Sequence, residues 1–213
     1  MSAVPAVPVR ALVQARMSSA RFPGKVLAPL NGRPLIAYVL AAIEQIPSHP
    51  PVVVATSADE SDDPLVRYLE HAGCTLFRGP LDDVFERFRA CARAFPCDWI
   101  LRLSADSPRL DPALLQRVID AAADDLDIVT TIFPRRTFPR GQNAELIRTR
   151  ALLAIDDREL TADDREHVTP YFYRHAPRFA IRSIESSEPQ LGGESLAVDT
   201  VEDLRRLSEG AGG

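Results

Sequence analysis

Near its amino terminus the chain reads Gln14-Ala15-Arg16-Met17-Ser18-Ser19-Ala20-Arg21-Phe22-Pro23-Gly24-Lys25. A short apolar run before it, residues 10–13, predicts a strand, and residues 33–40 after it predict a helix with Pro34 in its first turn. The quoted stretch is therefore a loop between a strand and a helix, and it carries three cations, two serines and a glycine. Backbone N–H groups and hydroxyls in such a loop hold phosphate oxygens, while arginine and lysine neutralise their charge.

The spacing of this loop matches neither of the two common phosphate-binding signatures. It contains no Gly-x-x-x-x-Gly-Lys-Ser/Thr and no Gly-x-Gly-x-x-Gly. The alternative interpretation is a basic surface loop that contains Gly and Pro.

The composition suits a soluble globular protein. The chain has 213 residues, of which 46% are hydrophobic and 26% charged, and this length allows one α/β domain with a substantial core. Its formal net charge of −5 argues against general binding to nucleic acid, which usually requires a basic face. A basic loop in an acidic protein points instead to a small anionic ligand.

The sequence predicts a cytoplasmic protein that is not bound to a membrane. Its three cysteines, Cys74, Cys91 and Cys97, are dispersed and lack metal-ligand spacing, which is typical of a reducing compartment. No apolar run approaches the roughly 20 residues that span a bilayer. Residues 1–8 have neither a charged region nor a long apolar core, so we expect a loose tail rather than a signal peptide.

Strands and helices alternate along much of the chain. Apolar or β-branched runs predict strands at residues 52–56, 75–77, 98–103 and 127–131. Helical periodicity and caps predict helices at residues 63–71, 82–95 and 111–123. This order predicts a mostly parallel, doubly wound sheet that binds its ligand at the carboxyl ends of the strands.

The remaining third of the chain begins with a connection rich in proline and arginine, residues 133–141. After it we expect a strand at residues 179–184 and helices near residues 150–157, after Thr161 and at 201–207. No repeat, low-complexity block or clear linker interrupts the chain. We therefore expect one domain over residues 1–213, in which residues 132–195 form a small arm or subdomain.

Two aspartates follow apolar runs. Asp106 comes just after the predicted strand at residues 98–103, and Asp199 ends the run Leu196-Ala197-Val198. Carboxylates at this edge of a sheet, facing a phosphate loop, suit a Mg²⁺ ion that keeps several waters and bridges phosphates. The alternatives are a turn, in which Asp106 bonds its own backbone, and a helix cap at Asp199.

Polar residues within and just after the proline-rich connection form a candidate acceptor site, which consists of Arg135, Arg136, Arg140, Gln142, Asn143 and Glu145. His167, with Arg165, is a candidate for the same pocket, and Arg78 is a candidate contact to a nucleobase. Such side chains suit a polyhydroxylated, anionic acceptor. The alternatives are a solvated surface for the cluster and a charge-paired helix face around His167.

Four motifs together resemble the cytidylyltransferase family that activates sugar acids, in particular its spore-coat polysaccharide biosynthesis branch. They are residues 14–25, Arg102-Leu103-Ser104-Ala105-Asp106-Ser107-Pro108, Asp164-Arg165-Glu166-His167-Val168-Thr169-Pro170-Tyr171 and Val198-Asp199-Thr200-Val201-Glu202-Asp203-Leu204. The resemblance extends from about residue 10 to residue 207. The chain is more distantly similar to 3-deoxy-manno-octulosonate and acylneuraminate cytidylyltransferases.

The resemblance implies a Rossmann-like nucleotide-diphosphosugar transferase fold and a Mg²⁺-dependent transfer of CMP from CTP to an anionic acceptor, a sugar acid, with release of pyrophosphate. It also implies a homodimer formed through residues 132–195. Arg16, Lys25 and Asp106 are then predicted to be catalytic, and Asp106 and Asp199 to hold the metal. The predicted nucleotide-binding residues are Gln14, Ala15, Arg16, Ser18, Ser19, Arg21, Lys25 and Arg78. The predicted acceptor-binding residues are Arg140, Gln142, Asn143, Glu145 and His167.

The chain departs from the family pattern at two places. Ala105-Asp106-Ser107-Pro108 stands where the branch commonly has Gly-Asp-Cys-Pro, which keeps the aspartate between small residues. Gly141-Gln142-Asn143-Ala144-Glu145 stands where the branch often has Gly-Leu-Asp-Val-Glu. Asn143 thus removes a charge from the acceptor side, and an organic phosphonate or another anion is an alternative acceptor.

Two other classes of function stay open. A glycosyltransferase on the same fold would use a formed nucleotide sugar, and it commonly carries Asp-x-Asp for its metal, which does not follow the strand at Leu101. A non-catalytic nucleotide-binding module would bind nucleotide without releasing pyrophosphate.

Overall fold

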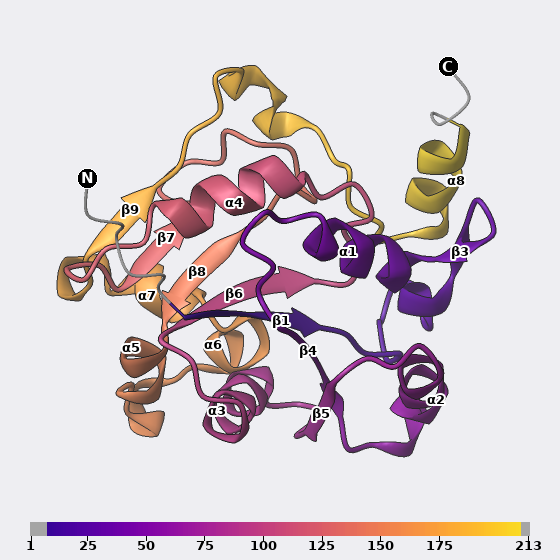
Figure 1. The fold of residues 1–213 in the computed structure, drawn as a ribbon, viewed down its shortest axis with the longest axis horizontal. Coiled ribbons are helices and arrows are strands. Elements are labelled where there is room, and N and C mark those ends of the chain that lie inside the picture. The colour runs from indigo at the N-terminus through magenta and orange to yellow at the C-terminus, as the bar shows by residue number, and fades with distance from the viewer. Residues whose placement is uncertain (1–7, 210–213) are drawn as a thin grey trace.

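A seven-stranded sheet organises the computed structural model, which describes residues 8–209 (Figure 1). The strands lie in the order β5-β4-β1-β6-β8-β7-β9. They are β1 (Val9–Gln14), β4 (Val52–Ser57), β5 (Leu76–Gly79), β6 (Trp99–Ser104), β7 (Ile128–Thr130), β8 (Glu145–Arg148) and β9 (Ile181–Ser183). A separate antiparallel pair is formed by β2 (Pro29–Leu30) and β3 (Arg33–Pro34). The tail expected at residues 1–8 lies, apart from its last residue, outside the described residues.

The sheet is mostly parallel, as the sequence predicts. β1 pairs in parallel with β4 and β6, β4 with β5, and β7 with β9, whereas β8 runs antiparallel between β6 and β7. The central strand β1 is buried on both faces, since Ala11, Leu12 and Val13 are all 0% exposed. This burial explains why the strand reads as a continuous apolar run rather than as an alternating one.

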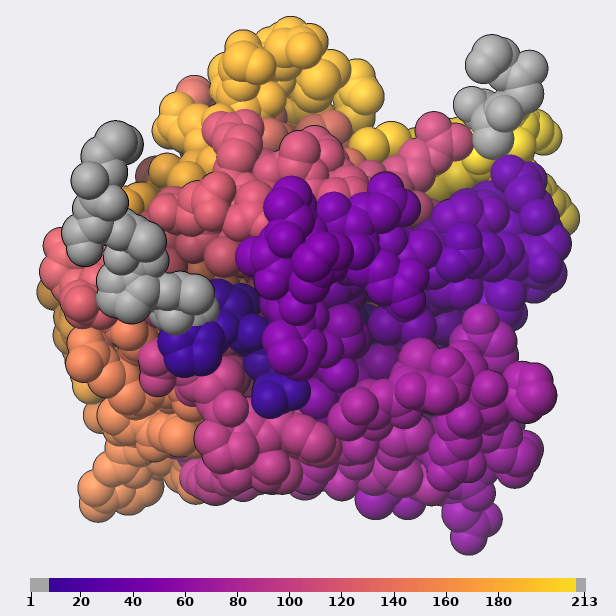
Figure 2. All heavy atoms as spheres, viewed as in Figure 1, coloured from indigo at the N-terminus to yellow at the C-terminus, as the bar shows by residue number. Residues whose placement is uncertain are grey.

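Helices cover both faces of the sheet. They are α1 (Leu35–Glu44), α2 (Asp63–His71), α3 (Val84–Ala94), α4 (Pro112–Asp120), α5 (Thr149–Leu153), α6 (Ala162–His167), α7 (Pro170–Arg174) and α8 (Val201–Glu209). In Figure 1, α1 and α4 lie above the sheet, and α3, α5 and α6 lie below it. Figure 2 shows the same side with all atoms, where α1 and α4 lie at the near surface. Within the described residues, no helix is both long and apolar enough to cross a bilayer.

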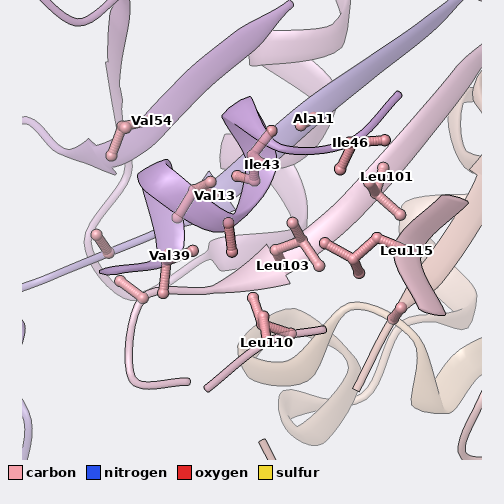
Figure 3. Packing of buried hydrophobic residues seen from close by; sticks show 14 of the residues in the cluster. Ala11, Val13, Val39, Ile43, Ile46, Val54, Leu101, Leu103, Leu110 and Leu115 are labelled. Atoms are coloured by element: carbon pink, nitrogen blue, oxygen red, sulfur yellow. The ribbon is translucent and has the colours of Figure 1, made fainter. Parts of the chain in front are cut away.

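Two apolar clusters, one on each face, form the main core. Ala11 and Val13 point into the cluster under α1, α2 and α4, and Leu12 points into the cluster over α3, α5 and α7, as the two-residue period of a strand requires. Figure 3 shows the first cluster, in which Val39 and Ile43 of α1 and Leu115 of α4 pack near Val13, Leu101 and Leu103 of the sheet.

Local signals account for several helix ends. Asp111 accepts a hydrogen bond from the Ala113 N–H at 2.8 Å, directly before Pro112 begins α4. Thr161 and Asp164 form a reciprocal capping box at the start of α6. The helix expected near residues 150–157 is shorter, because α5 ends at Leu153 and Asp156 then caps a separate 3-10 turn (Asp157–Glu159).

Residues 132–195, expected as an arm or subdomain, contribute to the sheet itself. They supply β8, between β6 and β7, and β9, at the edge beside β7. The connection before β8 and the end of α6 reach the carboxyl ends of the central strands, where they meet the loop that follows β1.

Candidate active site

A pocket of about 500 Å³ lies at the carboxyl ends of β1 and β6. Five segments line it: the loop after β1, the turn after β6, the connection before β8, the end of α6, and the residues before α8. In doubly wound sheets this position, outside the carboxyl ends of strands whose connections leave in opposite directions, is where ligands bind.

The loop after β1 is shaped by its own backbone. The Gly24 N–H donates to the Met17 carbonyl at 2.7 Å, which closes the loop on itself. Gly24 adopts a φ of 75°, in the left-handed region that glycine enters without strain. A 3-10 turn (Lys25–Leu27) follows directly and turns Lys25 towards the pocket. The loop therefore presents its cations from a defined backbone.

Lys25 lies between the two aspartates predicted to hold a metal. Its Nζ donates to Asp106 Oδ2 at 2.7 Å, to Asp199 Oδ1 at 3.0 Å and to the Val198 carbonyl at 3.1 Å. Arg21 reaches the other oxygen of Asp199, with its Nη2 at 3.0 Å from Oδ2. The Val198 N–H donates to the Asp106 carbonyl at 2.9 Å, which joins the two acidic segments through their backbones.

Asp199 does not cap α8 with its side chain, and Asp106 contacts other side chains rather than its own backbone. The start of α8 is capped by Thr200 and Asp203, since Asp203 Oδ2 accepts the Thr200 N–H at 3.0 Å and Thr200 Oγ1 accepts the Asp203 N–H at 3.2 Å. The Asp199 carboxylate is thus left to contact Lys25 and Arg21. The Asp106 carboxylate accepts from Lys25, and its other oxygen accepts from the Ser107 hydroxyl at 3.3 Å.

Asp106 and Asp199 form a donor set that suits Mg²⁺. The part of the chain described here has no group of three or more His, Cys, Asp or Glu side chains that could hold a metal. Mg²⁺ needs no such group, because one or two carboxylates together with substrate phosphates suffice. The two carboxylates already share one cation, the Lys25 ammonium, so their oxygens converge on a position where positive charge is stabilised.

Arg16 and Arg102 are held by glutamates. Arg16, in the loop after β1, pairs with Glu166 on α6. Arg102 of β6 donates to Glu145 Oε2 at 2.6 Å and to Gln14 Oε1 at 2.9 Å. Glu145 is only 1% exposed, and it also accepts a hydrogen bond from the Tyr173 hydroxyl. Burial, together with the charge of Glu145, raises the pKa of Tyr173 well above its ordinary value.

The end of α6 is strained beside the pocket. Val168, which follows His167, has a φ of 71° and a ψ of −56°, and the Thr169 N–H donates to the His167 carbonyl at 2.8 Å. These values describe a γ-turn that β-branched residues rarely adopt. Strained residues of this kind cluster at functional sites, and this one lies directly after Glu166 and His167 in the pocket lining.

The other end of the pocket has positive charge without a carboxylate partner. Arg136 donates to Asn143 Oδ1, and burial and the nearby charge of Arg140 lower the pKa of Arg136. Among the described residues, neither Arg136 nor Arg140 forms an ion pair with a carboxylate, whereas the other basic residues that line the pocket do. An isolated parallel β-bridge between the backbones of Arg140 and Ser195 joins this connection to the residues before α8.

Most of the predicted site residues meet in this pocket. Those that line it are Gln14, Ala15, Arg16, Ser19, Arg21, Lys25, Asp106, Arg140, Asn143, His167 and Asp199. Ser18 does not line it, and Glu145 lies behind Arg102. Gln142 is turned towards α4, where it accepts the Asp111 N–H at 3.0 Å. Arg78 donates to the Ser57 carbonyl at 2.8 Å and pairs with Asp63, outside the pocket lining.

Sequence reasoning assigned no role to Arg102 or to Asp62. Arg102 stands between Leu101 and Leu103 in an otherwise apolar strand. A lone arginine in a buried strand usually has a partner, and this pattern could have indicated a role for Arg102. Asp62 is fully buried and accepts from the Met17 N–H in the loop after β1. Nothing in the local sequence separates Asp62 from its acidic neighbours Glu60 and Asp63.

A basic loop that faces two carboxylates at this edge of a doubly wound sheet is the arrangement expected of a nucleotide-binding enzyme. The family model described as "Cytidylyltransferase" matches residues 10–203, and the chain belongs to this family. The spore coat polysaccharide biosynthesis protein SpsF of Bacillus subtilis (strain 168) is 32% identical over 205 residues, which cover 92% of this chain and 83% of that protein. The resemblance inferred from the motifs is thus confirmed.

Solved structures of the same class share the fold. A cytidylyltransferase from Leptospira borgpetersenii serovar Hardjo-bovis (strain JB197) superimposes with a TM-score of 0.89 at 28% identity, over 95% of this chain and 85% of that one. A CMP:2-keto-3-deoxy-manno-octonic acid synthetase complexed with CTP gives a TM-score of 0.73 at 16% identity, over 95% and 98% of the two chains. The predicted nucleotide-diphosphosugar transferase fold is confirmed, and the protein is a nucleotidyltransferase.

Proposed function

We propose that this protein is a Mg²⁺-dependent cytidylyltransferase that transfers CMP from CTP to a sugar acid and releases pyrophosphate. The observation that carries the proposal is that Arg16, Arg21 and Lys25, from one loop, line the same pocket as Asp106 and Asp199, to which Lys25 and Arg21 are paired. The membership in the cytidylyltransferase family supports it, as does the shared fold of a synthetase that was solved with CTP.

The nucleotide end of the pocket is built for a triphosphate. In-line attack by an acceptor oxygen on the α-phosphate requires chiefly positioning and neutralisation of charge. Arg16, Arg21 and Lys25 would bind the triphosphate and stabilise the departing pyrophosphate. Asp106 and Asp199 would hold Mg²⁺, which when bound lowers the charge repulsion at the phosphates. The backbone of the loop and Gln14, which Arg102 orients, would lie near the nucleotide.

The acceptor end of the pocket favours an anionic substrate. Arg136 and Arg140, which form no ion pair within residues 8–209, face the same cavity as the phosphate loop. A planar carboxylate accepts two parallel hydrogen bonds from a guanidinium, which gives both affinity and orientation. Asn143 and His167, on the same walls, offer donors and acceptors to hydroxyl groups. These features together match a sugar acid, with an organic phosphonate as the competing acceptor.

Thermal unfolding in the presence of CTP, UTP, ATP and GTP, each with and without Mg²⁺, tests the nucleotide part of the proposal. A ligand that binds only the folded state at a hundredfold excess over its Kd stabilises it by about 2.7 kcal/mol. We expect the largest stabilisation with CTP and Mg²⁺. No stabilisation by any triphosphate, together with stabilisation by a nucleotide sugar, would favour a glycosyltransferase; stabilisation by CTP without any pyrophosphate release would favour a binding module.

The homodimer through residues 132–195, the single domain and the cytoplasmic location stay proposals as well. Sedimentation velocity over a range of protein concentrations tests the first, with a species of twice the chain mass as the expected result. Limited proteolysis tests the second, since one domain yields no stable fragment cut within residues 132–195. Fractionation of cells tests the third.

A further inference from the structure

Lys25 is the sole lysine of the chain. Of the 25 basic residues, the other 24 are arginines. The two side chains differ in shape as well as chemistry, because an ammonium is a compact point charge with three rotating donors and a guanidinium is a flat fork. The presence of lysine at this one position, in a chain with 24 arginines, therefore indicates a contact that requires an ammonium rather than a guanidinium.

The surroundings of Lys25 match the three donors of an ammonium. Its Nζ has three oxygen partners, Asp106 Oδ2, Asp199 Oδ1 and the Val198 carbonyl, at 2.7, 3.0 and 3.1 Å. The side chain is only 12% exposed. Three converging oxygens around one largely enclosed cation resemble part of the coordination shell of a metal ion more than a surface ion pair.

The charges around the two aspartates cancel without any added ion. Asp106 and Asp199 carry two negative charges, and Lys25 and Arg21 supply two positive ones in direct contact. A divalent cation that approached the protein alone would meet a neutral cluster. It would have to displace an ammonium already held by both carboxylates.

We propose that Lys25 occupies the position of the divalent cation until the nucleotide arrives. This inference rests on the proposed function, in which the triphosphate is the group that draws Lys25 and Arg21 away from the carboxylates. Released by the phosphates, Asp106 and Asp199 then hold the metal. The hydrogen bond from the Val198 N–H to the Asp106 carbonyl keeps the two acidic segments together throughout. Metal and nucleotide consequently bind interdependently, each raising the affinity for the other by the same factor.

Binding of Mn²⁺ to nucleotide-free protein, followed by the electron paramagnetic resonance signal of the unbound ion, tests the proposal. The variants are Lys25→Met, which removes the ammonium, and Arg67→Met, which removes one positive charge from an exposed position on α2 that does not line the pocket. We expect Lys25→Met to bind Mn²⁺ about tenfold more tightly than the wild type, because the competing charge is gone. Arg67→Met is expected to bind as the wild type does. Equal or weaker binding by Lys25→Met would overturn the proposal.

A second measurement on the unaltered protein avoids any effect of the substitution on folding. Because the chain has one lysine, protein labelled with ¹⁵N in the lysine side chain gives a single Nζ resonance. We expect this resonance to stay in place on addition of Mg²⁺ alone and to move when CTP and Mg²⁺ are added together. A full displacement by Mg²⁺ alone would overturn the proposal.

The two experiments separate this inference from the proposed function. If CTP and Mg²⁺ stabilise the wild type but Lys25→Met gains no affinity for Mn²⁺, the inference fails and the function stands. If Lys25→Met gains affinity while no triphosphate binds or moves the lysine resonance, Lys25 still competes with the metal and the assignment of the nucleotide fails.

Discussion

Asp62 Oδ1 accepts the backbone N–H of Met17 at 2.6 Å, so a carboxylate from the segment after β4 holds the loop after β1. Its other oxygen accepts from the Thr56 hydroxyl and the Ser57 N–H, both at 2.9 Å, and the residue is fully buried. A buried carboxylate that loses its hydrogen bonds destabilises the folded state. The hydrogen bonds of Asp62 therefore hold the loop after β1 in one conformation. The Asp62 carboxylate thus fixes the backbone from which the cations of the loop extend.

Asp62→Asn should weaken nucleotide binding through the shape of the loop. The amide keeps the volume of the carboxylate but turns donors towards the donors of Thr56 and Ser57. We expect the free energy of unfolding to fall by about 2 kcal/mol and the KM for CTP to rise about tenfold with a smaller change in kcat.

Denaturant unfolding and steady-state pyrophosphate release measure these two effects. Asp59→Asn is a matched control, because Asp59 caps the turn at Ser61 and its side chain forms no hydrogen bond with the loop among the residues that the structure describes. A variant Asp62→Asn with wild-type KM for CTP would show that the loop does not depend on this carboxylate.

Asp106→Ala should abolish most turnover and leave the fold intact. Asp106 is partly exposed to the pocket rather than buried in the core, with 22% of its side chain accessible. The loss of one charge-stabilising group in an active site lowers kcat by about 100-fold to 1,000-fold. Circular dichroism and thermal unfolding verify the fold, and a folded variant with normal pyrophosphate release would remove Asp106 from the mechanism.

Arg136→Met and Arg140→Met should affect the acceptor and spare the nucleotide. Each arginine lines the pocket without a carboxylate partner among the described residues. Loss of a charge-assisted contact with an oxyanion costs roughly 1.5–3 kcal/mol, so we expect the KM for the sugar acid to rise about tenfold or more with an unchanged KM for CTP. Arg135→Met is the neighbouring control, since Arg135 is exposed and lies outside the lining. An equal rise in KM for CTP and for the sugar acid would show that the two arginines do not bind the acceptor specifically.

The stability of the protein should fall in acid partly through Asp164. Burial raises the pKa of this carboxyl, but hydrogen bonds from Arg174 and Thr161 outweigh it and lower the pKa from 3.8 to about 2. Because the folded-state pKa lies below the unfolded one, the stabilisation is present above pH 3.8 and is lost as the pH falls through about 2.

Urea unfolding at pH 5 and at pH 2.5 measures this contribution, for which we expect a loss on the order of 1 kcal/mol. In Asp164→Asn the same drop in pH should cost correspondingly less stability. An identical pH dependence in the variant and the wild type would assign the acid sensitivity to other carboxyls.

Local patterns in the sequence predict much of the fold. The helix at residues 63–71 and its stop before Gly73 agree with α2, and Asp111-Pro112 marks the start of α4. These signals act between neighbours in the chain, through caps and hydrophobic periodicity. The insertion of β8 against β6 and β7 has no such signal, because the direction of a strand in a sheet is decided by residues far apart in the sequence.

The site was predictable where its residues follow strands. Lys25 and Asp106 follow β1 and β6, and the parallel sheet brings them to one edge. Asp199 lies in the last segment of the chain and follows no strand of the sheet among the described residues. Its proximity to Asp106 could be inferred only from the hypothesis that both aspartates bind the same metal ion. Glu145 pairs with Arg102 of the pocket lining because β8 pairs with β6. Neither segment alone carries a sequence signal for that strand pairing.

The transfer reaction itself tests the central claim most directly. Protein freed of metal by chelation is incubated with CTP and a panel of sugar acids, with and without Mg²⁺, and both pyrophosphate and the CMP conjugate are measured by mass spectrometry. The account predicts that the two products appear in equal amounts, and only when CTP, Mg²⁺ and an acid acceptor are all present. Transfer that proceeds equally well from UTP, ATP and GTP, or no conjugate with any acid, would contradict it.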